Sequence, residues 1–461
     1  MRVILLFLFL TAASLRAAGP VYVVLWFDTE DYVEPAADDA AMRIARDLTS
    51  QGVRATFKVV GEKARTLEQR GRRDVLDALA LHDIGYHSNL HSGQPTPALY
   101  LRDLGFVEGA AEFARRERPG MLDLVRIFGV VPSCYGQPGS SWAPQTNVAL
   151  RKMGIPVYLD EGSQVGLNDQ PFWYGGLLHV FNMGRYQLRA PLDGSQPLAA
   201  SFARFDRAAA ELASQAGGVI SIYYHPTEFV TTEFWDAVNF AKGANPERAN
   251  WARPGRRSES ESERCFGILH DYVAHVKGVP GVRFVTAREL SQLYGKPSAP
   301  SISREQIAAH MSARQIFLET GSGVLSAADM LLALLGMEPQ FVDGPSTRAT
   351  STFRGEAIPR PAFEHSKADA VSFISANQRL PAAVWIGSET LSIGDFAATL
   401  AGDRGDGDVA VRRANLEFEK YFSNEPAKAF DWPIHPEGFR APELLELGRL
   451  QGWTLKPARL R

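Results

Sequence analysis

Apolar runs alternate with helix-patterned segments over the first two thirds of the chain. VYVVLWF at 21–27, VRATFKVVG at 53–61 and GGVISIYY at 217–224 have the pattern of buried strands. Shorter strands are predicted at 84–87, 155–159 and 282–286, and helical spacing occurs at 39–51, 73–81, 97–116, 120–128, 265–277 and 287–294. About seven strand–helix units before Gly295 predict an α/β fold with mostly parallel strands, and this number suits a barrel.

The pattern changes at KPSAPSIS, residues 296–303, whose prolines and serines indicate a boundary. Helical patterns follow at 301–317, 326–335 and 393–400, with loop-rich stretches between them. LSAADMLLALLG and LSIGDFAATLAG share a Leu-Ser start, an acidic residue at the same place and a final glycine, which predicts a weak internal repeat. We therefore predict a barrel domain over residues 19–298 and a smaller, mainly α-helical accessory domain over residues 299–461.

The N-terminal residues have the features of a secretory signal peptide. Arg2 precedes an apolar run at 3–10, and small residues follow around Ala18. The run is shorter than the roughly 20 residues that span a bilayer, so a retained anchor is the alternative. We expect residues 1–18 to be removed, leaving no membrane span, and the protein to be secreted or periplasmic, with association with the cell envelope as a further expectation.

Composition excludes some partners. The chain has 461 residues, 45% of them hydrophobic, and 49 basic against 52 acidic side chains give a net charge of −3. No basic field therefore favours nucleic acid or an anionic membrane. Export would expose Cys134 and Cys265 to oxidation, where they form either one disulfide or two unpaired core residues.

Candidate metal ligands follow two of the predicted strands. WFDTED places Asp28 and Glu30 on one side of an extended backbone and Asp31 on the other. In LHDIGYHSNLHSG, His87 and His91 are four residues apart, which puts both on one face if the segment makes a helical turn. Two histidines and a carboxylate are a common divalent-metal set, and strand ends converge in an α/β barrel. The choice between Glu30 and Asp31 as the ligand stays open.

A further histidine follows the strand of ISIYYHPTEF. His225, held by Pro226, is suited to act as a general acid, and a capping or core histidine is the alternative. Aromatic side chains in loop-rich stretches would either stack on sugar rings or pack inside the protein: Trp142, Trp173, Tyr174 and Trp235.

These motifs together resemble a known family. FDTED, ATFKVVGEKA, HDIGYHSNLHSG, YGQPGSSW and YYHPTEF, in this order, are similar to the polysaccharide deacetylases of the NodB-homology class, carbohydrate esterase family 4, over about residues 20–296. The resemblance implies a distorted (β/α) barrel of the NodB type that removes N-acetyl groups from a polysaccharide or cell-wall glycan with a divalent metal, commonly zinc. It implies Asp28 as catalytic base, His225 as general acid, and Glu30, His87 and His91 as metal ligands. Candidate substrate contacts are Tyr135, Gln137, Trp142 and Glu228.

The sequence departs from the family at one position that matters for the base. Most members carry an arginine just before the proline of the third motif, whereas this chain reads Gly136-Gln137-Pro138. Gln137 or a group from another segment would then have to orient Asp28 by hydrogen bonding, and losing the charged partner would change the pKa of the base. The family's fourth motif has no secure match, although Asp160 and Glu161 are candidates.

Three functions therefore stay open. The first is a secreted, metal-dependent sugar N-deacetylase. The second is a catalytically weakened protein of the same fold that binds cell-wall carbohydrate, and the third is another metal hydrolase on a similar barrel. The C-terminal third weakly resembles repeat modules that bind pseudomurein or other cell-wall polymers, and a packing domain without a ligand is its alternative.

Overall fold

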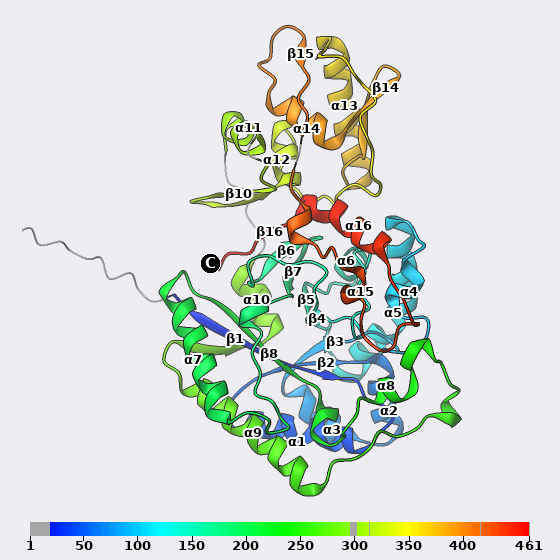
Figure 1. The fold of residues 1–461 in the computed structure, drawn as a ribbon, viewed down its shortest axis with the longest axis vertical. Coiled ribbons are helices and arrows are strands. Elements are labelled where there is room, and N and C mark those ends of the chain that lie inside the picture. Colours follow the sequence, from blue (N-terminus) through cyan, green and yellow to red (C-terminus); the bar gives the residue numbers. More distant parts are fainter. Residues whose placement is uncertain (1–18, 296–301, 313, 415, 461) are drawn as a thin grey trace, which may run out of the picture.

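The computed structural model describes residues 19–460 except 296–301, 313 and 415 (Figure 1). The predicted signal peptide lies outside the described residues, as does most of the predicted boundary segment at 296–303. Among the described residues, no helix combines the length and the apolar character that a membrane crossing requires.

A curled ten-stranded sheet forms the centre of the larger part of the molecule. Its order is β16-β6-β7-β5-β4-β3-β2-β1-β8. The tenth strand, β9, pairs with the first half of β1, whereas β2 pairs with the second half. The pairs of β6 with β7 and with β16 are antiparallel, and the other pairs are parallel. The strands are β1 (Val21–Thr29), β2 (Thr56–Val59), β3 (Asp83–Tyr86), β4 (Cys134–Tyr135), β5 (Val157–Leu159), β6 (Phe172–Tyr174), β7 (Leu177–Val180), β8 (Gly218–Tyr224), β9 (Val282–Val285) and β16 (Lys456–Pro457).

The sheet nearly closes on itself. Beyond β7, Gln187 makes a parallel bridge with Ser221 of β8, so the chain reaches the far edge of the sheet. The predicted distorted (β/α) barrel is therefore confirmed, and the carboxyl ends of its parallel strands face one mouth.

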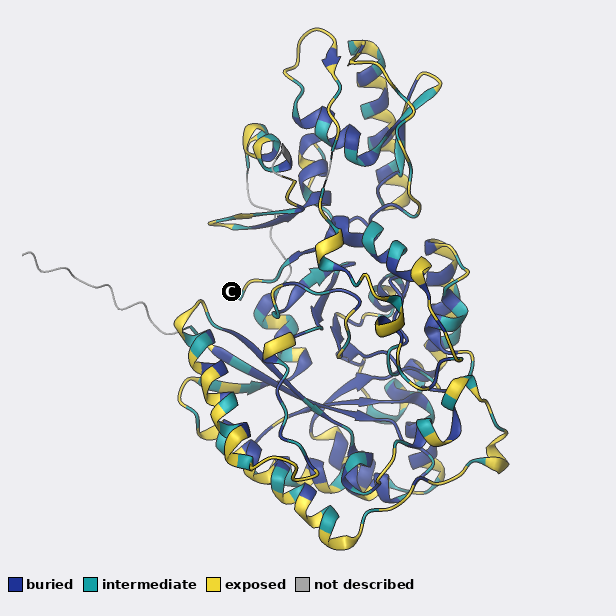
Figure 2. Ribbon diagram, viewed as in Figure 1, coloured by how far each residue is buried: buried dark blue, intermediate teal, exposed yellow. Residues whose placement is uncertain are grey.

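Helices cover the outside of the sheet, with buried inner faces and exposed outer faces (Figure 2). They are α1 (Ala36–Ser50), α2 (Gly61–Gln69), α3 (Arg73–Ala80), α4 (Pro97–Leu101), α5 (Phe106–Phe128), α6 (Thr146–Lys152), α7 (Leu198–Ser214), α8 (Trp235–Asn239), α9 (Glu259–Gly278) and α10 (Ala287–Tyr294). The sequence predicts helices at 97–116 and 120–128, whereas the structure breaks the segment after Leu101 and continues α5 through Pro119. Pro119 removes a single backbone N–H, and buried Phe113 and Leu124 hold the helix against the core on both sides of it.

The C-terminal region contains the predicted repeat. A helix, a β-hairpin and a second helix occur twice: α11 (Arg304–Ser312), β10 (Phe317–Thr320), β11 (Gly323–Ser326) and α12 (Ala327–Leu334), then α13 (Arg360–Asn377), β13 (Ala383–Ile386), β14 (Glu389–Ser392) and α14 (Ile393–Ala401). A short pair, β12 (Ala357–Ile358) and β15 (Val409–Ala410), completes it. Ser326 and Ser392 cap the second helix of each unit by accepting the backbone N–H of Asp329 and Asp395. The shared Leu-Ser-x-x-Asp pattern is thus a helix start that follows a hairpin.

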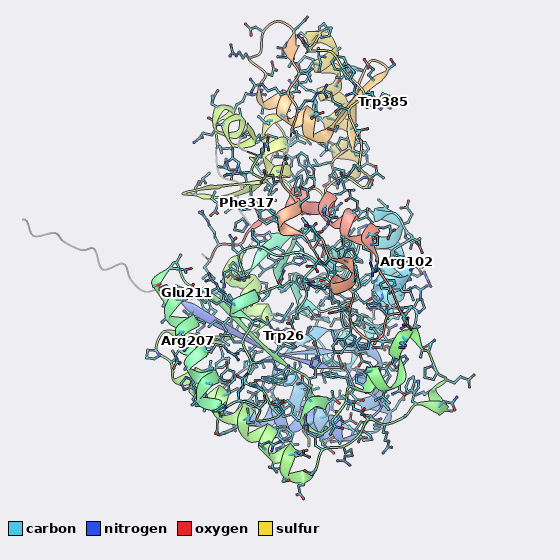
Figure 3. All side chains as sticks on the ribbon, viewed as in Figure 1. Trp26, Arg102, Arg207, Glu211, Phe317 and Trp385 are labelled. Atoms are coloured by element: carbon cyan, nitrogen blue, oxygen red, sulfur yellow. The ribbon has the colours of Figure 1, made fainter. Side chains whose placement is uncertain are left out.

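The two hairpins of the repeat present aromatic side chains differently. Phe317 of β10 is half-buried and lies near the barrel, whereas Trp385 of β13 is exposed at the far end of the molecule (Figure 3). The second hairpin therefore keeps its outer face free of the barrel.

The last segment of the chain returns to the barrel. It contains α15 (Pro426–Ala429), α16 (Pro442–Gln451) and β16, the strand that extends the sheet. Phe430 and Leu444 belong to the barrel's hydrophobic core, whereas apolar residues of the two repeat units form a separate cluster. The division at residue 298 stays a prediction, but residues near the C-terminus pack with the barrel.

Both cysteines are buried and free, so of the two alternatives the structure has the unpaired one. Cys134 lies in β4, and Cys265 in α9 donates to the carbonyl of Leu192.

His179 of β7 predicts acid sensitivity of the barrel. Its buried ring stacks on Tyr158 and Phe172, and burial lowers its pKa to about 3. The pKa of histidine in the unfolded chain is about 6.5. Below that pH the unfolded state takes up the proton first, so the stability of the folded state falls. Between pH 6.5 and pH 4 we expect this histidine to cost the wild type about 3 kcal/mol of stability, at about 1.4 kcal/mol per pH unit. His179→Phe should not show this loss.

Urea denaturation of both proteins at several pH values tests this expectation. His365→Phe, which changes an exposed ring on α13, should behave like the wild type. Parallel loss of stability in the wild type and in His179→Phe would contradict it.

Candidate active site

A polar pocket of about 580 Å³ opens at the mouth of the barrel. The loops that follow β1, β3, β4, β5 and β8 contribute to its wall. It brings together the five residues that the sequence assigned to catalysis and metal binding and both candidates for the fourth motif: Asp28, Glu30, His87, His91, His225, Asp160 and Glu161.

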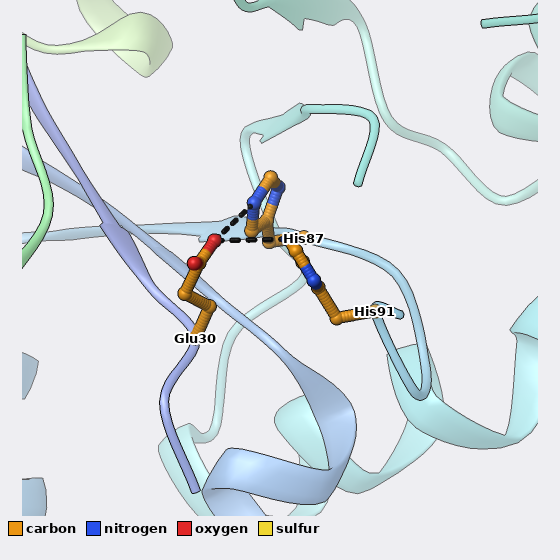
Figure 4. Close-up of side chains that lie close together, drawn as sticks. All are labelled: Glu30, His87 and His91. Carbon is orange, nitrogen blue, oxygen red and sulfur yellow. Dashed lines mark hydrogen bonds and ion pairs between the residues drawn. The ribbon is translucent and has the colours of Figure 1, made fainter. Parts of the chain in front are cut away.

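Glu30, His87 and His91 form a compact set of metal-ligand groups. Oε2 of Glu30 lies 3.1 Å from Nε2 of His87 and 2.9 Å from Nε2 of His91 (Figure 4). Nδ1 of His87 donates to the carbonyl of Gly136 at 3.1 Å, which leaves the Nε2 lone pair of the neutral ring facing Glu30. The ligand atoms of all three residues lie within 4.8 Å of one another. This buried donor set fits a divalent metal ion.

The surroundings keep His87 and Glu30 in the form that binds a metal. Burial lowers the pKa of His87, which favours the neutral imidazole. Burial alone would lower the pKa of His91 too, but the charge of Glu30 raises it above its usual value, so a metal ion would displace a proton from this ring. Burial alone would raise the pKa of Glu30, but His91 and His87 together hold it well below its usual range. Nε1 of Trp235 donates to the other carboxylate oxygen of Glu30 at 3.1 Å and fixes its orientation.

The two histidines meet through a loop and not through the predicted helical turn. β3 ends at Tyr86, and Ser88 and His91 have positive φ angles of 64° and 54°. A hydrogen bond from the backbone N–H of His91 to Oγ of Ser88 closes this loop. The spacing of four thus has a different structural basis from the one that the sequence suggested.

Asp31 points away from the pocket. Its carboxylate accepts the backbone N–H groups of Val33 and Glu34, each at 2.9 Å, and the hydroxyl of Thr227 at 2.8 Å. Alternation along the end of β1 therefore separates Asp31, which holds the turn, from Asp28 and Glu30. Of the two open candidates, Glu30 is the one beside the histidines.

Asp28 has a cationic partner that the sequence pattern did not reveal. Nζ of the buried Lys58 lies 2.9 Å from Oδ1 of Asp28 and 3.0 Å from Oδ2 of Asp160. Lys58 sits on β2 directly opposite Asp28 on β1. Burial alone would lower the pKa of Lys58, but Asp160 and Asp28 raise it above its usual value, so the side chain is charged. Gly136 leaves room for it, because a Cβ there would lie 2.0 Å from Nζ.

Lys58 therefore occupies the electrostatic position that the absent arginine leaves open. Gln137, which stands where the family has the arginine, accepts a hydrogen bond from the hydroxyl of Tyr158 at 2.8 Å and donates to the carbonyl of Gly139. The predicted alternative, orientation of Asp28 by Gln137, has no contact to support it. Burial, opposed by Lys58, raises the pKa of Asp160 to about 7.

His225 stands on the other side of Asp28. Its Nε2 lies 3.6 Å from Oδ2 of Asp28, and its Nδ1 lies 2.6 Å from Oε1 of Glu228. Arg189 forms an ion pair with Glu228. Burial alone would lower the pKa of His225, but the bond to Glu228 and the nearby carboxylates raise it to about 9. His225 is therefore protonated near neutral pH and can donate a proton.

Two of the four predicted substrate contacts, Gln137 and Glu228, line the pocket. The predictions for Tyr135 and Trp142 are wrong, because both side chains are buried and neither belongs to the pocket wall. Tyr135 lies in β4 among Tyr86, Phe113 and Tyr158, so its ring is part of the core.

The other aromatic candidates have different positions. Trp173 lines a separate cavity between the barrel and the first repeat unit, and buried Tyr174 donates to the carbonyl of Gly448. Residues to which the sequence assigned no role complete the wall, among them Ser140 and Trp432.

Comparisons with known proteins place this chain near several solved structures at low identity. No family model matches, and no curated protein matches. A polysaccharide deacetylase structure from Mycobacterium smegmatis is 18% identical, covers 60% of this chain and 93% of its own, and has a TM-score of 0.36. A family 4 acetyl xylan esterase from Clostridium thermocellum, in complex with a cobalt ion, is 17% identical, with coverage of 60% and 93% and a TM-score of 0.31.

A 4-alpha-glucanotransferase from Thermococcus litoralis is also similar, at 12% identity, with coverage of 59% of this chain and 40% of its own and a TM-score of 0.41. Polysaccharide deacetylases and esterases of carbohydrate esterase family 4, whose motifs this sequence resembles, are thus among the structural neighbours of the chain.

Proposed function

We propose that this protein is a metal-dependent hydrolase that removes N-acetyl groups from an N-acetylated glycan. One observation carries the proposal. Asp28 lies between the cation of Lys58 and the imidazole of His225, whose pKa is raised. The metal-ligand set of Glu30, His87 and His91 lies next to it. A base, an acid and a metal-ligand set thus share one pocket.

The residues have separate tasks in this reaction. A divalent ion held by Glu30, His87 and His91, with zinc as the first choice, would polarise the acetyl carbonyl and make a water molecule more acidic. Asp28 accepts the proton of the attacking water, and Lys58 orients the carboxylate through their ion pair. His225 donates a proton to the amide nitrogen as the C–N bond breaks and a C–O bond forms, which yields acetate and a free amino sugar.

The rival function is glycan binding by a protein of this fold without turnover. Its main support was the missing arginine of the third motif. Because Lys58 brings a cation to Asp28 from β2, this support is weakened. The enzyme is the function that the geometry favours.

Acetate release decides between the two. We expect the purified protein to contain about one metal ion and to release acetate from N-acetylglucosamine oligomers, and Asp28→Asn to keep the metal but release no acetate. Metal and glycan binding without acetate from any acetylated glycan would favour the rival. New reducing ends would instead indicate glycosidase action.

The ligand set makes its own prediction. We expect His91→Ala to weaken metal binding on the order of 100-fold, since loss of a supporting contact alone costs up to about that much. Competition with a chromogenic chelator measures this. Asp31→Asn is the matched control: it should lose stability at the turn but retain the metal. Equal metal loss in both variants would contradict the assignment of Glu30.

We also propose that the protein acts outside the cytoplasm, because its glycan substrate would lie there and residues 1–18 have a signal-peptide pattern. Fractionation of cells that express the full chain, with N-terminal sequencing of the product, tests this. Uncleaved protein in the cytoplasm would contradict it.

A further inference from the structure

A segment near the C-terminus crosses the rim of the barrel mouth. We call residues 421–436 the C-terminal strap. The carbonyl of Tyr421 accepts the backbone N–H of Gly166 at 3.0 Å, and the carbonyl of Ala429 accepts the side-chain amide of Gln164 at 2.5 Å. The carbonyl of Ile434 accepts the side-chain amide of Gln94 at 2.8 Å. The strap is therefore fastened to loops that follow β3 and β5.

Trp432 joins two further loops across the rim. Its backbone N–H donates to Oγ of Ser140 at 2.9 Å, and its ring lies on Gly139, where an added Cβ would come within 2.3 Å of it. Its Nε1 donates to Oδ2 of Asp236 at 2.7 Å, and its ring meets the edge of Phe234. Trp432 thus spans the gap between the loop after β4 and the loop after β8.

The contact between Trp432 and Asp236 lies next to His91, one of the metal-ligand histidines. Oδ2 of Asp236 also accepts the hydroxyl of Ser92 at 3.3 Å and lies 4.0 Å from Nδ1 of His91. Trp432 lines the pocket, as do Ala429 of the strap and Glu161, Asn182 and Tyr223 of the barrel. Through the contact of Trp432 with Asp236, the strap therefore forms the wall of the pocket next to His91.

We propose that the C-terminal strap closes one end of the substrate cleft, so that the site takes the terminal residue of a glycan chain or a short oligosaccharide. This inference rests on the proposed deacetylase function and specifies its substrate class. An internal residue of a polymer can reach Asp28 only if the chain leaves the site in two directions, and the strap blocks one of them. A volume of about 580 Å³ also suits a small ligand.

The position of deacetylation tests the proposal. An N-acetylglucosamine hexamer labelled at its reducing end is incubated with the protein, and fragment masses locate the free amines. We expect at least about tenfold more deacetylation at one terminal unit than at any internal unit. Even deacetylation along the hexamer, or a preference for internal units, would overturn the proposal.

Removal of the Trp432 side chain provides a second test of the proposal. In Trp432→Ala, internal units should become substrates and the terminal preference should fall to about twofold or less. Phe341→Ala, which removes an exposed aromatic ring outside this pocket, should keep the wild-type pattern. Circular dichroism verifies that each variant is folded, and an unchanged terminal preference in folded Trp432→Ala would count against the strap.

A binding series separates failure of this proposal from failure of the deacetylase function. Calorimetric titration of Asp28→Asn with oligomers of one to six units should show affinity that stops rising after about two units. Affinity that keeps rising to six units, or no binding of any oligomer, would overturn the closed cleft, whether or not the wild type releases acetate.

Discussion

Replacing Lys58 by methionine is expected to lower kcat for acetate release about 100-fold, while the metal content and KM stay close to those of the wild type. Lys58 is buried and lies outside the pocket wall, so its loss removes no contact with substrate. It does remove the cation that Asp28 and Asp160 share. Without that charge Asp28 and Asp160 repel each other and Asp28 loses its position, and a positioned base contributes about 100-fold or more to such a reaction.

Two variants distinguish a role in the base from a role in stability. Arg151→Met breaks another ion pair, 2.7 Å from Arg151 to Asp343, and should lower the denaturation midpoint but not kcat. The double variant Lys58→Met/Gln137→Arg returns a cation from the position that the family uses, and we expect it to regain at least about tenfold in kcat. A Lys58→Met protein with wild-type kcat would show that Asp28 needs no cation.

The convergence of the site was predictable because it follows from topology. Asp28, Glu30, His87 and His225 each come at or just after the end of a strand, and parallel strands bring such ends to one mouth. The alternation of side chains along an extended backbone also puts Asp31 on the opposite side from Asp28 and Glu30, and this follows from the order of the residues alone. Local pattern and barrel geometry were enough for these residues.

Lys58 could not be paired with Asp28 from local pattern. The signal was present, since a single charge inside the apolar run ATFKVVG is costly unless it has a partner. Naming that partner requires the register of β1 and β2, which sets Asp28 opposite Lys58. Trp432 is harder still, because it follows the barrel motifs by some 200 residues and nothing in its surroundings indicates a catalytic pocket.

Removing the charge of Glu228 should shift the alkaline limb of the pH–rate profile to lower pH by about one unit, a typical effect of one nearby charge. Oε1 of Glu228 lies 2.6 Å from Nδ1 of His225, and this contact contributes to the raised pKa of about 9. A general acid works only while protonated, so activity falls as pH rises through its pKa. Glu228→Gln lowers that pKa, and the loss of activity therefore begins earlier.

The kcat/KM of Glu228→Gln for acetate release from a short oligomer should accordingly be close to that of the wild type at pH 6 and about fivefold lower at pH 9. His225→Ala, which removes the proton donor itself, should lose on the order of 100-fold or more across the whole range. Glu161→Gln changes another carboxylate of the pocket, one that pairs with Tyr223 and not with His225, and its alkaline limb should stay in place. A shift of the acidic limb in Glu228→Gln, with the alkaline limb unmoved, would instead make His225 the base and require another group to protonate the leaving amine.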